Sequence, residues 1–310
     1  MAGNPLREPA YAPKPMVMVT DPHALLESID RLPVMPAVAS RVLAFDDDVV
    51  SVMELSQVVS SDPALTVALL KVANSAYYGF ARELSTVREA VMLLGFKQVR
   101  QVAVGASMMH AWTGARREND GFDLDLFWGH SMAVAVMAET AARKFNAARP
   151  EEAFTAGVVH DMGVLAVRKA YPAEFALAVQ QARRRGGPLC DAELEFLGFT
   201  HAQVGAALAE RWELPARLVD AVGRHHDALL TPANDGLAGV LAFADQVTGH
   251  YGVHCGYARG QIVPVRTLPD ELATLEIACG GIGSVLERSC AFISSVSGPP
   301  KVWYSSPMAA

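Results

Sequence analysis

Five histidines and two aspartates between residues 130 and 245 are the residues whose types could do chemistry together. They are His130, His160, Asp161, His201, His225, His226 and Asp245. Imidazole nitrogens and carboxylate oxygens are good ligands for Zn, Fe, Mn and Ni and suit Ca less well. As an ordered set, these residues predict a site for one or two divalent transition-metal ions. The sequence assigns none of them a catalytic role.

The pair His160–Asp161 lies in the middle of an almost wholly apolar run, residues 154–167. A run of this kind predicts one buried helix. An ionisable pair is costly to bury unless something binds it, and a metal ion is one such partner. A core histidine that is hydrogen-bonded to its neighbouring aspartate is the other interpretation, and a single His–Asp pair does not decide between the two.

The remaining ligands of such an ion must come from other helices. Adjacent residues on a helix diverge by about 100°, so His160 and Asp161 can share an ion only if it lies over the seam between them. His130 and Asp245 are the natural candidates to complete the coordination, as in metal sites built between facing helices of a bundle. The other three histidines would add a second ion or bind an anionic ligand. Taken singly, His201 also fits an exposed N-cap, and His225–His226 a solvated helix end.

The elements that must position these residues are helices. Ser51 with Glu54, and Asp62 with Pro63, carry the capping signals that begin helices. Apolar helical spacing follows through most of the chain. The helices expected to carry or flank these residues are 126–146, 150–171, 172–185, 189–197, 201–212, 215–226 and 237–251. No strand alternation is sustained, so the fold class is all-α, and the polar segment 113–121 is the best domain boundary.

Composition limits the function classes. The chain has 310 residues, of which 51% are hydrophobic, and no long run free of charge predicts a transmembrane helix. The proline-rich residues 1–20 do not resemble a secretory signal and predict a disordered lead-in. Four cysteines without a CxxC pair favour a reducing cytoplasm. A net charge of −7 without a broad basic field argues against nucleic acid as a partner.

The order H…HD…H…HH…D resembles the HD superfamily of metal-dependent phosphohydrolases, and the first half of the chain narrows the resemblance to the HDOD domain. The segments that carry it are Leu32–Pro36, Ser60–Thr66, Lys71–Gly79, Glu89–Phe96, Phe127–Ser131, Glu152–Asp161, Gly198–Gly205 and Trp212–Pro215. The resemblance covers roughly Leu32 to Gly249. It implies a two-part helical domain, in which an N-terminal helical bundle (21–115) packs on an HD-like bundle (116–252), followed by a C-terminal helical extension (253–310).

The resemblance also implies a regulatory module of bacterial signalling that acts through signalling proteins or a bound ligand. The alternative is a phosphohydrolase or phosphodiesterase acting on a nucleotide or a cyclic dinucleotide. The related cyclic-di-GMP phosphodiesterases carry a lysine shortly after the His–Asp pair, where this chain has Met162–Leu165. They also carry a Gly-Tyr-Pro motif after the double histidine, where this chain has Asp227–Pro232. A cation that would neutralise phosphate is therefore missing, which favours the regulatory function.

Overall fold

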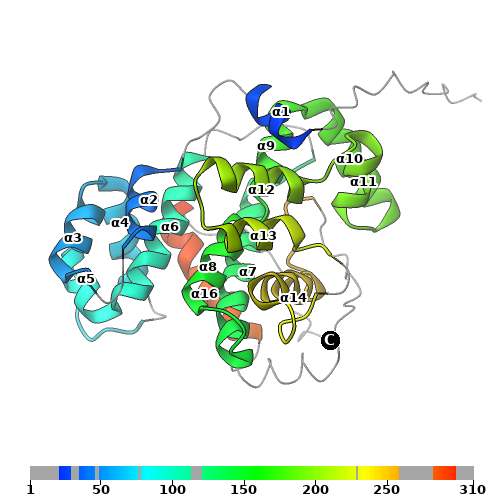
Figure 1. Cartoon of the computed structure of the whole chain (residues 1–310). Helices are drawn as coiled ribbons and strands as arrows, with labels where there is room; N and C mark the ends of the chain where they lie inside the picture. Colours follow the sequence, from blue (N-terminus) through cyan, green and yellow to red (C-terminus); the bar gives the residue numbers. More distant parts are fainter. Residues whose placement is uncertain are drawn as a thin grey trace, which may run out of the picture.

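The protein is built from helices. A computed structural model describes residues 21–28, 35–45, 49–75, 78–112, 121–227, 230–257 and 282–297, and within these ranges every regular element is helical (Figure 1). The all-α prediction is therefore confirmed. Across the described part of the chain, no helix combines the length and the apolar character needed to cross a membrane.

The first group of helices forms the bundle on the left of Figure 1. It consists of α2 (Ala37–Leu43), α3 (Val52–Ser60), α4 (Pro63–Ala73), α5 (Val87–Leu94) and α6 (Phe96–Ala111), which pack against one another. The predicted capping signals are present. The Ser51 hydroxyl accepts the N–H of Glu54 in a capping box, and Asp62 caps α4 ahead of Pro63. Gly95 separates α5 from α6 at φ 83°, a conformation that favours glycine.

The second group surrounds one long helix. It consists of α7 (Leu124–Phe145), α8 (Pro150–Val159), α9 (Met162–Ala170), α10 (Pro172–Arg185), α11 (Leu189–Phe196), α12 (His201–Arg211), α13 (Ala216–Arg224) and α14 (Gly236–His250). Most residues of α7 are buried, because α8, α14 and the C-terminal helix all pack on it. Gly157 lets α8 lie close to α7, since an added Cβ there would be 2.4 Å from the Cα of Ala135.

Two terminal helices pack on the second group, and one of them also contacts the first. Helix α1 (Pro22–Ser28) contacts α9 and α12, although it precedes the first bundle in sequence. Helix α16 (Ile282–Ser297) lies along α7 and also contacts α4 and α6 (Figure 1). The domain boundaries at 115 and 252 stay a prediction. Most of the 113–121 segment lies outside the described residues. So do the expected lead-in, residues 1–20, and most of 258–310 apart from α16.

The expectation of one helix through His160 and Asp161 is wrong. Helix α8 ends at Val159 and α9 begins at Met162, with the two residues in the turn between them. Asp161 has ψ 8° instead of the helical value near −42°, and its carbonyl accepts the N–H of Val164 at 2.9 Å. Apolar periodicity could not reveal this break, because the residues on both sides of it are buried. In this turn the side chains of His160 and Asp161 converge, whereas those of adjacent residues in a helix would diverge.

Candidate metal centre

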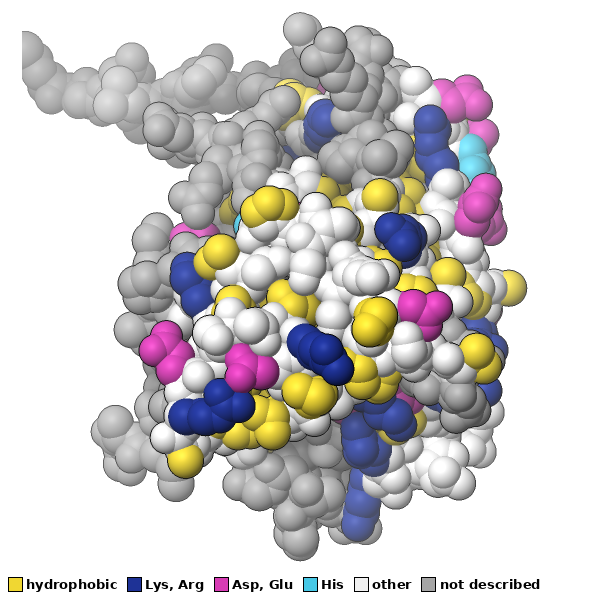
Figure 2. All heavy atoms as spheres, turned by 90° about the vertical axis from the view of Figure 1, so that its left-hand side faces the viewer, with side chains coloured by type: hydrophobic (Ala, Val, Ile, Leu, Met, Phe, Trp, Pro, Cys, Tyr) yellow, Lys and Arg dark blue, Asp and Glu magenta, His cyan; other side chains and the backbone are white. Residues whose placement is uncertain are grey.

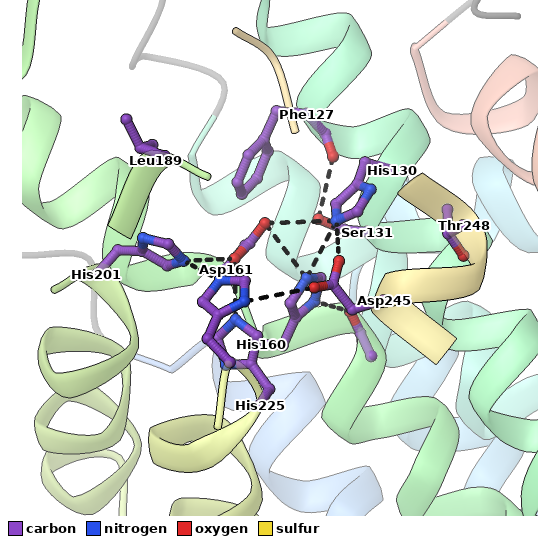
Figure 3. A network of polar contacts seen from close by, with 12 residues as sticks. Phe127, His130, Ser131, His160, Asp161, Leu189, His201, His225, Asp245 and Thr248 are labelled. Atoms are coloured by element: carbon purple, nitrogen blue, oxygen red, sulfur yellow. Dashed lines mark hydrogen bonds and ion pairs between the residues drawn. The ribbon is translucent and has the colours of Figure 1, made fainter. Parts of the chain in front are cut away.

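The structure brings all seven predicted residues to one place between α7, α12, α13 and α14 (Figure 3). Helix α7 carries His130, and the turn between α8 and α9 carries His160 and Asp161. His201 is the first residue of α12, His225 and His226 follow the end of α13, and Asp245 lies inside α14.

A close approach of two helices positions His201. Gly163 lies under α12, where an added Cβ would be 2.0 Å from the carbonyl oxygen of His201 and 2.6 Å from the backbone nitrogen of Gly205. The Thr200 hydroxyl caps α12 by accepting the N–H of Gln203, which fixes where the helix begins. The His201 ring is therefore held over the turn that carries Asp161.

Most of the cluster is buried. His160 and His225 have no exposed surface, and His130, Asp161 and His201 are each 3% exposed. An exposed N-cap at His201 and a solvated helix end at His225 are therefore wrong. The His226 side chain is 30% exposed and that of Asp245 is 14% exposed, so these two residues form the side of the cluster that solvent reaches.

The ligand atoms fall into two groups that could each hold a metal ion. One contains Asp161, His201, His225 and His226, and the other contains His130, His160 and Asp245. Asp161 lies between them. Its Oδ1 is 3.2 Å from His201 Nε2 and 3.5 Å from His225 Nε2. Its Oδ2 is 3.2 Å from His160 Nε2 and 3.6 Å from His130 Nε2. The sequence assigned Asp161 to the His130–His160–Asp245 set, whereas in the structure its carboxylate faces both groups.

Four of the five imidazoles form a hydrogen bond through Nδ1 to a group outside the cluster and direct Nε2 into the cluster. The Nδ1 atoms of His130, His160 and His225 donate to the carbonyls of Val253 (2.8 Å), Gly157 (2.8 Å) and Val222 (2.6 Å), and that of His201 donates to Glu193 Oε2 (2.6 Å). A carbonyl or carboxylate oxygen can only accept, so in a neutral ring the proton is on Nδ1 and the Nε2 lone pair is free. This is how metal-binding histidines are oriented.

The atoms inside the cluster lack protein partners that suit them. Among the described residues, His225 Nε2 and Asp161 Oδ1 are buried without a hydrogen bond. The Nε2 atoms of His130 and His160 face each other at 3.3 Å. An unsatisfied buried polar group costs about 1–3 kcal/mol, and a divalent cation would satisfy several lone pairs at once. The residues present therefore fit a metal ion.

The electrostatics agree with a cation site. Burial alone would raise the pKa of Asp161, but the facing His160, His201 and His225 hold that pKa well below its usual range. Burial also opposes ionisation of Asp245, yet its contact with His130 at 3.1 Å lowers the pKa of that carboxyl. Both carboxyls are therefore ionised, and they lie among largely buried imidazoles.

The buried carboxylate of Glu193 is a site residue that the sequence reasoning missed. It is fully buried and contacts the His201 ring. A signal was present along α11 and its C-cap, where Leu189, Ala192, Glu193 and Leu197 follow the spacing of an apolar stripe and are all buried. An acid at a core position of such a stripe indicates a buried partner.

Known proteins resemble this chain in both sequence and fold. Residues 32–228 match the HDOD domain family. A Treponema pallidum (strain Nichols) protein described as uncharacterized is 27% identical over 244 residues, which cover 75% of this chain. Those residues make up 46% of that relative, so the chain spans about half its length.

Solved structures resemble this chain in fold. An HDOD domain protein of unknown function from Geobacter sulfurreducens superposes with a TM-score of 0.73 at 24% identity, covering 88% of this chain and 96% of that one. A candidate phosphohydrolase from Shewanella amazonensis SB2B gives a TM-score of 0.64 at 28% identity, covering 88% and 98%. With the family match over most of the helical core and the two-part helical fold, the chain belongs to the HDOD family.

Proposed function

We propose that this chain is a regulatory HDOD module of bacterial signal transduction that acts through a protein partner or a bound ligand and holds one or two divalent transition-metal ions. The observation that carries the proposal is the convergence of four Nε2 atoms, each on a ring whose Nδ1 is bonded outward, around the carboxylate of Asp161. Two groups of ligand atoms favour two ions over one.

The regulatory part of the proposal is supported by what surrounds the site. Met162–Leu165 follow the His–Asp pair where the related phosphodiesterases have a lysine, and no Gly-Tyr-Pro follows His226. The first bundle also exposes apolar side chains on α3 and α5, namely Met53 (59%), Met92 (58%) and Leu93 (49%). Figure 2 shows that apolar and charged side chains alternate over the face of this bundle. Apolar side chains scattered among charged ones are common on protein surfaces, so the missing lysine and Gly-Tyr-Pro motif carry this part of the proposal.

A metal-dependent phosphohydrolase is the second candidate, and the complete ligand set favours it. Divalent ions supply Lewis-acid chemistry to phosphoester hydrolysis. In that reaction His130, His160, Asp161 and Asp245 would hold an ion, while the partly exposed His226 and Asp245 would border the side from which a phosphoester approaches. The substrate class would be a nucleotide or a cyclic dinucleotide.

Metal analysis followed by a phosphodiesterase assay tests both functions. Protein purified without added ions is analysed for Zn, Fe, Mn and Ni, and is then assayed on bis(p-nitrophenyl) phosphate and cyclic di-GMP. The variants His160→Ala and Asp161→Ala remove one ligand each. His23→Ala is the matched control, because His23 is exposed and pairs with Glu210 outside the site.

The outcomes separate the candidates. Stoichiometric metal without turnover, lost in the two site variants and kept in His23→Ala, supports the regulatory module. Turnover that both site variants abolish establishes the phosphohydrolase in its place. A wild-type chain that takes up no metal, and that is equally stable after His160→Ala, leaves His160 as an ordinary core histidine.

A further inference from the structure

One carboxylate oxygen holds His201 at two points. Glu193 Oε2 accepts the backbone N–H of His201 at 2.8 Å and its ring Nδ1–H at 2.6 Å. Glu193 belongs to α11 and is fully buried, and its hydrogen bonds cross from α11 to the first residue of α12. The main chain and the ring of one predicted ligand are therefore fixed by the same atom.

The position of this oxygen lowers the cost of burying the carboxylate, whose other oxygen, Oε1, has no hydrogen bond within the described part of the chain. Backbone N–H groups at the first turn of a helix have no partner within the helix, and the helix dipole is positive there. The Thr200 hydroxyl accepts the N–H of Gln203, which leaves the N–H of His201 for Glu193. A buried carboxylate costs much less free energy when it accepts hydrogen bonds at such a place.

The other inward-facing imidazoles have different partners. His130, His160 and His225 donate Nδ1–H to backbone carbonyls, whereas His201 donates to the side-chain carboxylate of Glu193. A carboxylate behind a metal-binding histidine orients the ring and raises its basicity, and such partners are typically worth 10–100-fold in metal affinity. One ligand group therefore has a carboxylate behind one of its histidines, whereas the histidines of the other group have only backbone carbonyls behind them.

We infer that Glu193 is a positioning residue that fixes the His201 ring and makes the group of Asp161, His201, His225 and His226 the tighter of two ion sites. The inference rests on the metal binding proposed above and assigns an order to it. The first ion enters this group, and the second enters the group of His130, His160 and Asp245 with lower affinity.

A purely structural role for Glu193 makes a different prediction. If Glu193 serves only to join α11 to α12, the neutral Glu193→Gln variant keeps that function, because an amide oxygen can accept the same two hydrogen bonds. The substitution removes the charge behind His201 and preserves the shape of the side chain. It therefore separates the electrostatic role from the role of a helix cap.

The experiment is a titration of the metal-free full-length protein with Co²⁺ and with Zn²⁺, in wild type and Glu193→Gln. Wild type is expected to bind in two steps. The variant is expected to lose about 10–100-fold in affinity at the tighter step and little at the weaker one. The visible spectrum of the first Co²⁺ equivalent is expected to change, because the ligand field at His201 changes. Glu139→Gln is the matched control, since Glu139 is also a buried carboxylate but binds Arg143 and Arg288.

A measurement on wild type alone covers the case in which Glu193→Gln does not fold. Histidine ring ¹⁵N resonances are followed during the Zn²⁺ titration. The first equivalent is expected to shift His201 and His225, and the second to shift His130 and His160. The reverse order, or simultaneous filling of both groups, overturns the inference.

The failures are distinguishable. Two binding steps that Glu193→Gln leaves unchanged, in affinity and in spectrum, overturn the inference and leave the metal-binding module intact. A wild-type chain that binds neither Co²⁺ nor Zn²⁺ removes both proposals, and that result needs no variant.

Discussion

The Nε2 atoms of His201 and His226 lie 2.9 Å apart, although the two residues are 25 positions apart and belong to different helical segments. Two neutral imidazole nitrogens can share one proton between them, and His201 already uses its Nδ1–H on Glu193. The nearby Asp161 Oδ1 has no hydrogen bond of its own in the described structure. Without a metal the contact is satisfied only if His226 carries its proton on Nε2 and donates it to His201. A metal ion bound by both nitrogens would replace that proton, so metal binding should have measurable consequences.

Metal binding is expected to stabilise the fold. A ligand present at 100 times its dissociation constant adds about 2.7 kcal/mol to the free energy of unfolding. Urea denaturation of the metal-free protein, with and without Zn²⁺, should show a rise of this size in wild type and a much smaller one in His160→Ala. His23→Ala should respond as wild type does. An equal response of wild type and His160→Ala would contradict the assignment of His160 as a ligand.

Gly163→Ala is expected to disturb the site through the backbone. The new Cβ would be 2.0 Å from the His201 carbonyl oxygen, so α12 must move away from α9. Overpacking of this kind costs about 1–3 kcal/mol in the free energy of unfolding, and the shift of His201 should also reduce bound metal. Gly187→Ala is the control, because an added Cβ there meets nothing within 4 Å. Normal metal content and stability in Gly163→Ala would show that the two helices do not approach this closely.

The capping box of α5 should make stability depend on pH in the acid range. Hydrogen bonds from Arg82, the Ser85 backbone and Thr86 lower the pKa of Glu89 from 4.5 to about 2. A lowered folded-state pKa means that the stabilisation is fully present above the unfolded value near 4.5 and is lost as the pH falls toward 2. Glu89→Gln should therefore be less stable than wild type at neutral pH, and the difference should shrink below pH 4.5. A difference in unfolding free energy that is constant with pH would refute this role.

Helix α16 is expected to be part of the core. Phe292 is 7% exposed and lies on Gly105 of α6, where an added Cβ would be 2.6 Å from the ring. Phe292→Ala should lower the free energy of unfolding by about 3 kcal/mol, in the range of buried aromatic truncations. Glu287→Ala, at an exposed position of the same helix, should change it little. Equal small effects of both variants would mean that α16 contributes nothing to stability.

Local signals determined where most helices begin. Ser51 with Glu54, Asp62 with Pro63, and Pro150 act within one turn of the chain, so their effect on the backbone is readable from the sequence. The types of the seven site residues were equally readable, because imidazoles and carboxylates among apolar neighbours need a partner. The break at His160–Asp161 was not, since apolar spacing is the same on both sides of it.

Long-range packing decided the arrangement of the site. The sequence named His130, His160 and Asp245, but their convergence depends on α7, the turn after α8, and α14 meeting in space. The orientation of each ring depends on Nδ1 acceptors such as Val253 O, 123 residues from His130, and Glu193. The chemistry that residues can offer is readable from the sequence, because it is a property of their types. Which atoms face one another depends on how close helices approach, and here glycines and buried carboxylates far apart in sequence set that distance.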